Sequence, residues 1–189
     1  MALLNKIEEK NAEGKLKELY KKMADPVDDK VANVLKVHSL NPNILEAHYD
    51  LYRQIMYGRS NLTRKEREMV AVMVSSVNDC GYWIEHHGAA LHKLTRKNKN
   101  IVQQILNDYI KADISNKEKE LLNYAEKLTN NNQKIDQKDI NNLKQHGLID
   151  KDILELNQVV AYFNYVNRIV DGLGVELEEE RSKIIDGRK

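Results

Sequence analysis

The residues whose types and spacing could do chemistry gather in one stretch, residues 68–92. Its polar and aromatic side chains are Glu68, Cys80, Tyr82, Trp83, Glu85, His86, His87 and His92. They include three of the six histidines and the only cysteine of the chain. A carboxylate and an imidazole can pass a proton near neutral pH, and a thiolate is a strong nucleophile. The stretch therefore indicates acid–base or thiol chemistry.

The spacing of these residues requires a turn between them. Glu68 and Cys80 are twelve residues apart, which on one straight helix is about 18 Å and too far for contact. Asn78 and Asp79 lie between them, and both residue types prefer caps and turns to helix interiors. We therefore expect an antiparallel pair of helices over residues 63–78 and 80–94.

This helical pair would bring the candidate groups together. Folding back at the turn places Glu68 and His87 at a similar level. Asp79 is expected to cap the second helix. Cys80 would then lie in the first helical turn, where unpaired N–H groups and the helix dipole favour a thiolate. Trp83 and His87 are four residues apart and share a face.

The other elements follow from apolar residues at helical spacing. Further helices are expected over residues 12–24, 42–57, 99–111, 116–129, 137–146 and 150–172, with one or two more turns within 27–40. Asn41-Pro42 is a helix start signal, and Thr63-x-x-Glu66 and Ser115-x-x-Glu118 match capping boxes. Gly147 is expected to end the 137–146 helix. The prediction is an all-α bundle of about seven to eight helices with no sheet.

Length and composition favour one domain over residues 1–189, with an N-terminal helical extension (1–40) and a core (41–178). Thirty basic and twenty-nine acidic residues give a net charge of +1, so neither nucleic acid nor a membrane surface is an expected partner. We find no secretory signal pattern and no apolar run of about 18 residues, and we expect a cytoplasmic protein. One cysteine excludes an internal disulfide and a cysteine-only metal site.

No metal or other cofactor is expected. A site built from Glu68, His86, His87 or His92 could bind zinc in principle, but adjacent histidines point apart on a helix.

Two blocks of the sequence carry a resemblance to a known family. The string EMVAVMVSSVNDCGYWIEHHGAAL contains a Glu, a Cys twelve residues on, and a His seven residues after that Cys. The second block comprises Ala161-Tyr162-Phe163-Asn164, Asn167-Arg168 and Leu173-Gly174-Val175. Over residues 30–178 the chain resembles the alkylhydroperoxidase D-like / carboxymuconolactone decarboxylase superfamily, and within it the peroxidase-related proteins. The family motif has Cys-x-x-Cys, and Trp83 stands where its second Cys belongs.

The resemblance implies a peroxidase-type oxidoreductase that uses only one cysteine. In the family, the Glu and the His activate the second Cys, which attacks a hydroperoxide, and the first Cys resolves the product. Here Cys80 would be the nucleophile, His87 the proton shuttle and Glu68 the base, with an external thiol or dithiol as reductant. Trp83, Tyr82 and His86 would line the substrate pocket. The family assembles as dimers, trimers or hexamers, so a homo-oligomer is expected.

Two other functions remain open. In the first, Glu68 and His87 do acid–base work on a small carboxylated substrate, as in the decarboxylase branch, and Cys80 is a bystander. The change from Cys to Trp83 favours this hypothesis because it removes a thiol and adds an apolar pocket wall. In the second, the chain is a catalytically silent scaffold that keeps the fold.

Overall fold

The structure is a computed structural model that describes residues 2–26, 29–95, 98 and 100–178 of the 189-residue chain. The helices, in chain order, are η1 (Glu9–Asn11), α1 (Gly14–Met23), α2 (Asn33–Lys36), α3 (Pro42–Tyr57), α4 (Arg64–Val77), α5 (Gly81–Leu94), α6 (Ile101–Asp108), α7 (Asn116–Asn131), η2 (Asn132–Lys134), α8 (Gln137–Gln145) and α9 (Asp150–Leu173). The described residues contain no strand. The prediction of an all-α bundle is confirmed. The four-residue α2 lies within 27–40, where one or two turns were predicted, and α6 lies within the predicted 99–111 helix. Residues 27, 28 and 99 of these ranges lie outside the described part.

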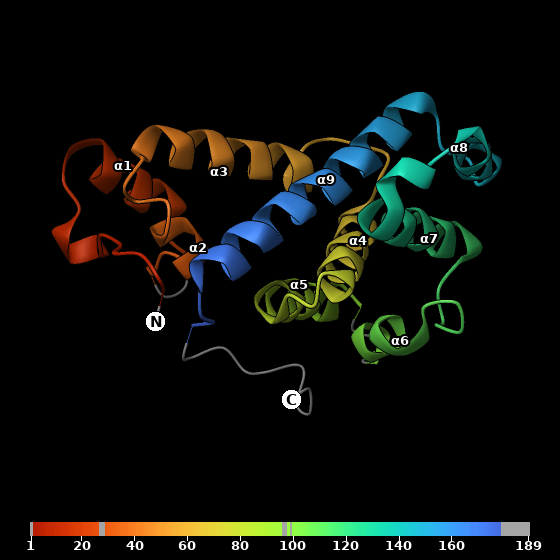
Figure 1. The fold of residues 1–189 in the computed structure, drawn as a ribbon, viewed down its shortest axis with the longest axis horizontal. Helices are drawn as coiled ribbons and strands as arrows, with labels where there is room; N and C mark the ends of the chain where they lie inside the picture. The colour runs from red at the N-terminus through yellow and green to blue at the C-terminus, as the bar shows by residue number, and fades with distance from the viewer. Residues whose placement is uncertain (1, 27–28, 96–97, 99, 179–189) are drawn as a thin grey trace.

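Helix α4 lies at the centre of the bundle. It packs against α3, α5, α6, α7 and α9, and α9 crosses it diagonally (Figure 1). Every residue of α4 from Glu66 to Ser75 is buried, as expected of a helix surrounded by others. The site described below depends on this helix, which is the most enclosed in the fold.

The first turns of α4 and α7 are built in the same way and are joined to each other. Thr63 and Ser115 each form the predicted capping box with the glutamate three residues on. A lysine beside each cap reaches the glutamate of the other helix. These ion pairs are Lys65–Glu118 at 2.6 Å and Lys117–Glu66 at 2.7 Å. The four interactions fix the starts of both helices.

The turn between α4 and α5 differs from the prediction. Asp79 adopts the left-handed conformation with φ of 55°, which Asp tolerates better than most residues. The chain reverses there, and Cys80 becomes the N-cap of α5, with its N–H donating to the Ser75 carbonyl at 2.9 Å. The prediction that Asp79 caps this helix is therefore wrong. Similarly, His146 is the C-cap of α8, and Gly147 follows it at a φ of 88°.

The N-terminal segments cover one end of α9. Helix α1 packs against α3 through a second apolar cluster that contains Leu16, Leu19 and Leu45. The Leu3 N–H donates to the Leu173 carbonyl at 2.9 Å. Both described ends of the chain therefore lie near the C-terminal end of α9 (Figure 1).

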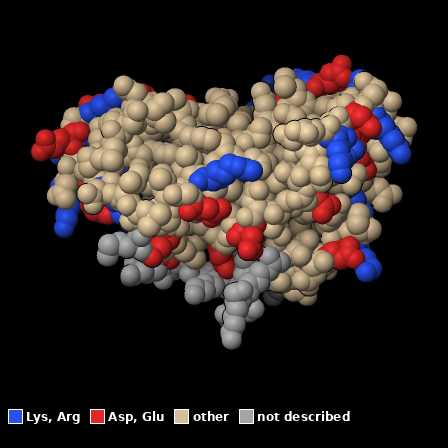
Figure 2. Space-filling model, viewed as in Figure 1, with Lys and Arg blue, Asp and Glu red and all other residues tan. Residues whose placement is uncertain are grey.

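The surface has no large field of one charge in the view of Figure 2, where basic and acidic side chains lie both near the centre of the face and at its edge. Among the described residues, no helix combines the length and the apolar character that crossing a membrane requires.

Candidate active site

Glu68 and His87 meet where α4 and α5 pack together. The His87 Nδ1 atom lies 2.5 Å from the Glu68 Oε2 atom, and the two residues are only 3 % and 0 % exposed. Arg64 precedes Glu68 by one helical turn and forms an ion pair with it. The carboxylate therefore has an imidazole and a guanidinium as partners in a buried setting.

The charges around Glu68 keep it ionised. Burial alone would raise the pKa of its carboxyl group, but His87 and Arg64, through charge and hydrogen bonds, hold the pKa below its usual value. An ionised carboxylate can only accept, so Nδ1 of His87 carries the hydrogen and donates it. Nε2 is then the atom of His87 available for proton transfer. It is buried without a hydrogen-bond partner among the described residues.

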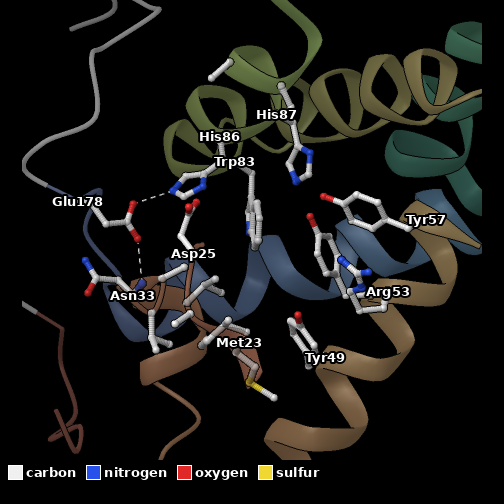
Figure 3. A pocket seen from close by; sticks show the side chains of 18 of the residues that line it. Met23, Asp25, Asn33, Tyr49, Arg53, Tyr57, Trp83, His86, His87 and Glu178 are labelled. Carbon is white, nitrogen blue, oxygen red and sulfur yellow. Dashed lines mark hydrogen bonds and ion pairs between the residues drawn. The ribbon is translucent and has the colours of Figure 1, made fainter. Parts of the chain in front are cut away.

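A cavity of about 890 Å³ lies beside this pair. Its wall comes from α3, α4, α5, α9 and the segments around α2, and Figure 3 shows part of it. The side chains that line the cavity include those of His48, Tyr52, Arg53, Tyr57, Arg64, Glu68, Trp83, His86, His87, Lys93, Tyr162 and Glu178.

Trp83 forms the wall next to His87. Its indole stacks on the His87 ring at 5.2 Å between centroids and meets Phe163 edge to face at 5.9 Å. Its Nε1 atom has no hydrogen-bond partner among the described residues. Trp83 therefore limits how the His87 ring can turn and gives the cavity a flat apolar surface.

A second histidine–carboxylate pair lies on the other side of Trp83. His86 Nε2 lies 2.8 Å from Glu178 Oε2, and the Tyr82 hydroxyl donates to Glu178 Oε1 at 3.0 Å. Burial alone would raise the pKa of Glu178, but the bonds to His86 and to the Asn33 N–H lower it to about 2. His86 lines the cavity, whereas Tyr82 is not among its lining residues and supports His86 from behind by stacking at 4.3 Å.

Cys80 is separated from the cavity. It is 0 % exposed and is not among the lining residues. Burial first, and a hydrogen bond with Asp171 second, raise the pKa of its thiol to about 12, and the N–H groups of Trp83 and Tyr82 offset this only in part. The prediction that the helix start favours a thiolate here is therefore wrong, because desolvation outweighs the helix end.

Other cavity groups come from α3 and α9. His48 lies under the Tyr162 ring, with Nε2 at 3.4 Å from the Tyr162 hydroxyl, and its ring meets His38 edge to face at 4.7 Å. Sequence reasoning missed these residues and Arg64. Only Arg64 had a local signal, its position four residues before Glu68.

The asparagines of the second block join α9 to the end of α4. Asn78 Nδ2 donates to Asn164 Oδ1 at 3.1 Å and to Asn167 Oδ1 at 3.3 Å. Asn167 Nδ2 donates to Ser75 Oγ at 3.3 Å. These bonds tie the end of α4 to α9.

Within the described part of the chain, no group of three His, Cys, Asp or Glu side chains is arranged to hold a metal ion.

Comparisons with known proteins agree with this architecture. Residues 42–103 match the family model of the Carboxymuconolactone decarboxylase family. The uncharacterized peroxidase-related protein from Silicibacter sp. TM1040 has a TM-score of 0.86 at 29% identity, over 95% of this chain and 93% of that chain. The alkylhydroperoxidase AhpD core protein from Ralstonia eutropha JMP134, also described as uncharacterized and peroxidase-related, has a TM-score of 0.85 at 25% identity, with the same coverage of 95% and 93%.

More distant structures share the fold alone. The apo debrominase Bmp8 has a TM-score of 0.73 at 18% identity, over 87% of this chain and 86% of that chain. A comparison with curated proteins found no match. The chain belongs to the alkylhydroperoxidase D-like / carboxymuconolactone decarboxylase superfamily.

Proposed function

We propose that the protein is an acid–base enzyme in which His87 moves a proton to or from a small substrate in the cavity. The observation that carries this proposal is the His87 Nε2 atom, which is buried without a hydrogen-bond partner among the described residues and belongs to a side chain that lines the cavity. An unsatisfied buried nitrogen costs stability, and a substrate proton would satisfy it.

Glu68 would serve as the positioning residue for His87. Its ionised carboxylate accepts a hydrogen bond from Nδ1–H, with 2.5 Å between Nδ1 and Oε2. The carboxylate would stabilise the imidazolium that forms when Nε2 takes a proton. Arg64 keeps the carboxylate from leaving this position, because it lies on the same helix face one turn earlier. The proton can then be returned from Nε2 to the substrate.

The cavity supports a small, partly flat and anionic substrate. Its volume of about 890 Å³ lies within the usual range for small-molecule sites. Trp83 and Tyr162 supply flat apolar walls, and Arg53 and Lys93 are exposed cations on its lining. A small carboxylated substrate would satisfy these groups.

The alternative is a one-cysteine peroxidase, and the name of two similar structures as peroxidase-related is what supports it. The thiol would have to be exposed and ionised to attack a hydroperoxide. Cys80 is fully buried and its pKa is raised, so we favour the acid–base function. Homo-oligomeric assembly and a cytoplasmic location remain predictions.

The test compares the wild type with two variants, His87→Gln and Cys80→Ser. Each protein is incubated in deuterium oxide with a panel of small carboxylated lactones and keto acids, and deuterium uptake by the substrate is followed by proton NMR. In parallel, loss of hydrogen peroxide and of an alkyl hydroperoxide is measured with dithiothreitol as reductant. We expect exchange that His87→Gln abolishes and Cys80→Ser retains. Peroxide consumption that disappears in Cys80→Ser, without any exchange, would overturn the proposal.

A further inference from the structure

The hydroxyl of Tyr57 points toward His87 at the wall of the cavity (Figure 3). Tyr57 is the last residue of α3, and Figure 3 shows its hydroxyl directed toward the His87 imidazole. Both residues line the same cavity. A substrate in this space would therefore be within reach of both the imidazole and the phenol.

Arg64 links the two sides. Its Nη2 atom forms the ion pair with Glu68 and also donates a hydrogen bond to the Tyr57 hydroxyl at 3.0 Å. Its Nη1 atom donates to the Met56 carbonyl at 3.0 Å, at the end of α3. The guanidinium lies 3.7 Å from the centroid of the Tyr57 ring. One side chain thus sets the position of the phenol relative to the Glu68–His87 pair.

The hydrogen bonds of Tyr57 leave its own proton for another partner. A guanidinium can only donate, so the Tyr57 oxygen accepts from Arg64. Tyr52 is also hydrogen-bonded to Tyr57. Burial first, then the nearby Tyr57 and Glu68, raise the pKa of Tyr52, and the rings of the two tyrosines meet edge to face at 5.9 Å between centroids. Because the Tyr57 oxygen accepts from Arg64, its own O–H is left to donate to a group in the cavity.

We propose that Tyr57 is a second catalytic residue, which donates a hydrogen bond to a substrate oxygen that becomes negative as His87 removes a proton from the neighbouring carbon. This inference rests on the proposed acid–base function and names its substrate class. The substrate is a ketone or lactone with a C–H bond next to the carbonyl group.

The proposed step is balanced without an oxidant or a reductant. His87 Nε2 takes the proton, the C–H electron pair forms a carbon–carbon double bond, and the carbonyl electron pair moves to oxygen. The resulting enolate oxygen accepts the Tyr57 hydrogen bond. Return of the proton from His87 to the same carbon, or to a conjugated one, restores the carbonyl and gives exchange or isomerisation.

The charged side chains of the site suit a step in which His87 becomes positive and the substrate oxygen becomes negative. Glu68 contacts the Nδ1 edge of the imidazole, so a negative charge lies beside the ring that receives the proton. On the other side, Arg53 lies 4.5 Å from the centroid of the Tyr57 ring, in addition to Arg64. Two guanidinium groups therefore lie against the ring of the phenol that would bind the negative oxygen, and such fixed charges are an effective form of catalysis.

The test uses 4-nitrophenol, whose planar phenolate resembles an enolate and whose absorption band reports its environment. Binding is measured by absorbance and by calorimetry at mildly alkaline pH, where the probe is ionised. The variants are Tyr57→Phe and, as a matched control, Tyr49→Phe, which removes a hydroxyl from another cavity tyrosine. Nitrobenzene serves as the probe that lacks the phenolic oxygen.

We expect Tyr57→Phe to weaken phenolate binding by about tenfold or more, the value of a hydrogen bond to a charged group. Tyr49→Phe should leave it nearly unchanged, and neither variant should alter nitrobenzene binding. Equal phenolate affinity in wild type and Tyr57→Phe, or no saturable phenolate binding at all, overturns the inference. The exchange assay with His87→Gln tests the proposed function separately, because phenolate binding does not require proton transfer.

Discussion

Replacing His48 with glutamine should make the folded protein less sensitive to mild acid. His48 is 5 % exposed. Burial first, and the neighbouring His38 second, lower its pKa from 6.5 to about 4. The fold therefore requires the neutral imidazole. Because the unfolded chain takes up a proton that the folded chain does not, stability is fully present above about pH 6.5 and falls as the pH drops toward 4.

The size of the effect follows from the shift. A change from 6.5 to about 4, at about 1.4 kcal/mol for each pKa unit, gives a loss of about 3 kcal/mol near pH 4 and about 2 kcal/mol near pH 5. For a domain with a total stability of about 5–15 kcal/mol, this is readily measured.

The assay is urea unfolding of the wild type and His48→Gln at about pH 7 and about pH 5, followed by circular dichroism. The wild type should lose about 2 kcal/mol more than the variant between the two conditions. His92→Gln, which removes a partly exposed histidine of α5, controls for the loss of one imidazole. If His48→Gln and the wild type lose the same free energy of unfolding, the reasoning about burial is refuted.

Other substitutions test the remaining interactions. Glu68→Gln should lower the free energy of unfolding by about 1–3 kcal/mol in urea titrations, because the partly buried Arg64 loses its carboxylate partner; unchanged stability would argue against this ion pair. Thr63→Ala removes the α4 cap and should cost about 1 kcal/mol in thermal unfolding. Asn167→Ala breaks the bond to Ser75 and should cost about 1–3 kcal/mol, and a smaller loss would mean that the bond is replaced. Trp83→Cys puts a thiol in the cavity beside His87 and should create peroxide consumption, which Trp83→Ser should not.

The sequence predicted the helices well where local chemistry decides where they begin. Asn41 caps α3, with its side chain accepting from the Ile44 N–H, and Thr63 and Ser115 form their capping boxes. Asp79 was harder because Asp suits both an N-cap and a left-handed turn. The choice between them depends on how α5 packs against α4, which is a tertiary property.

The site was predictable only in part. The turn at Asn78-Asp79 was enough to place Glu68 beside His87, because both lie a similar distance from it. The raised pKa of Cys80 could not be predicted, because the helix start is a local feature, whereas the burial of the thiol and its hydrogen bond with Asp171 of α9 depend on tertiary packing. Tyr57 has no local signal either, since it reaches the cavity only through the packing of α3 on α4.

The exchanged lysines at the starts of α4 and α7 have a mechanical consequence. Lys65 and Lys117 each cross to the capping glutamate of the other helix. If either helix slid along its axis or turned about it, both ion pairs would break together. The two ion pairs therefore set the register of α4 against α7. Glu68 lies only two residues beyond Glu66, so the same ion pairs also help to position the carboxylate that contacts His87.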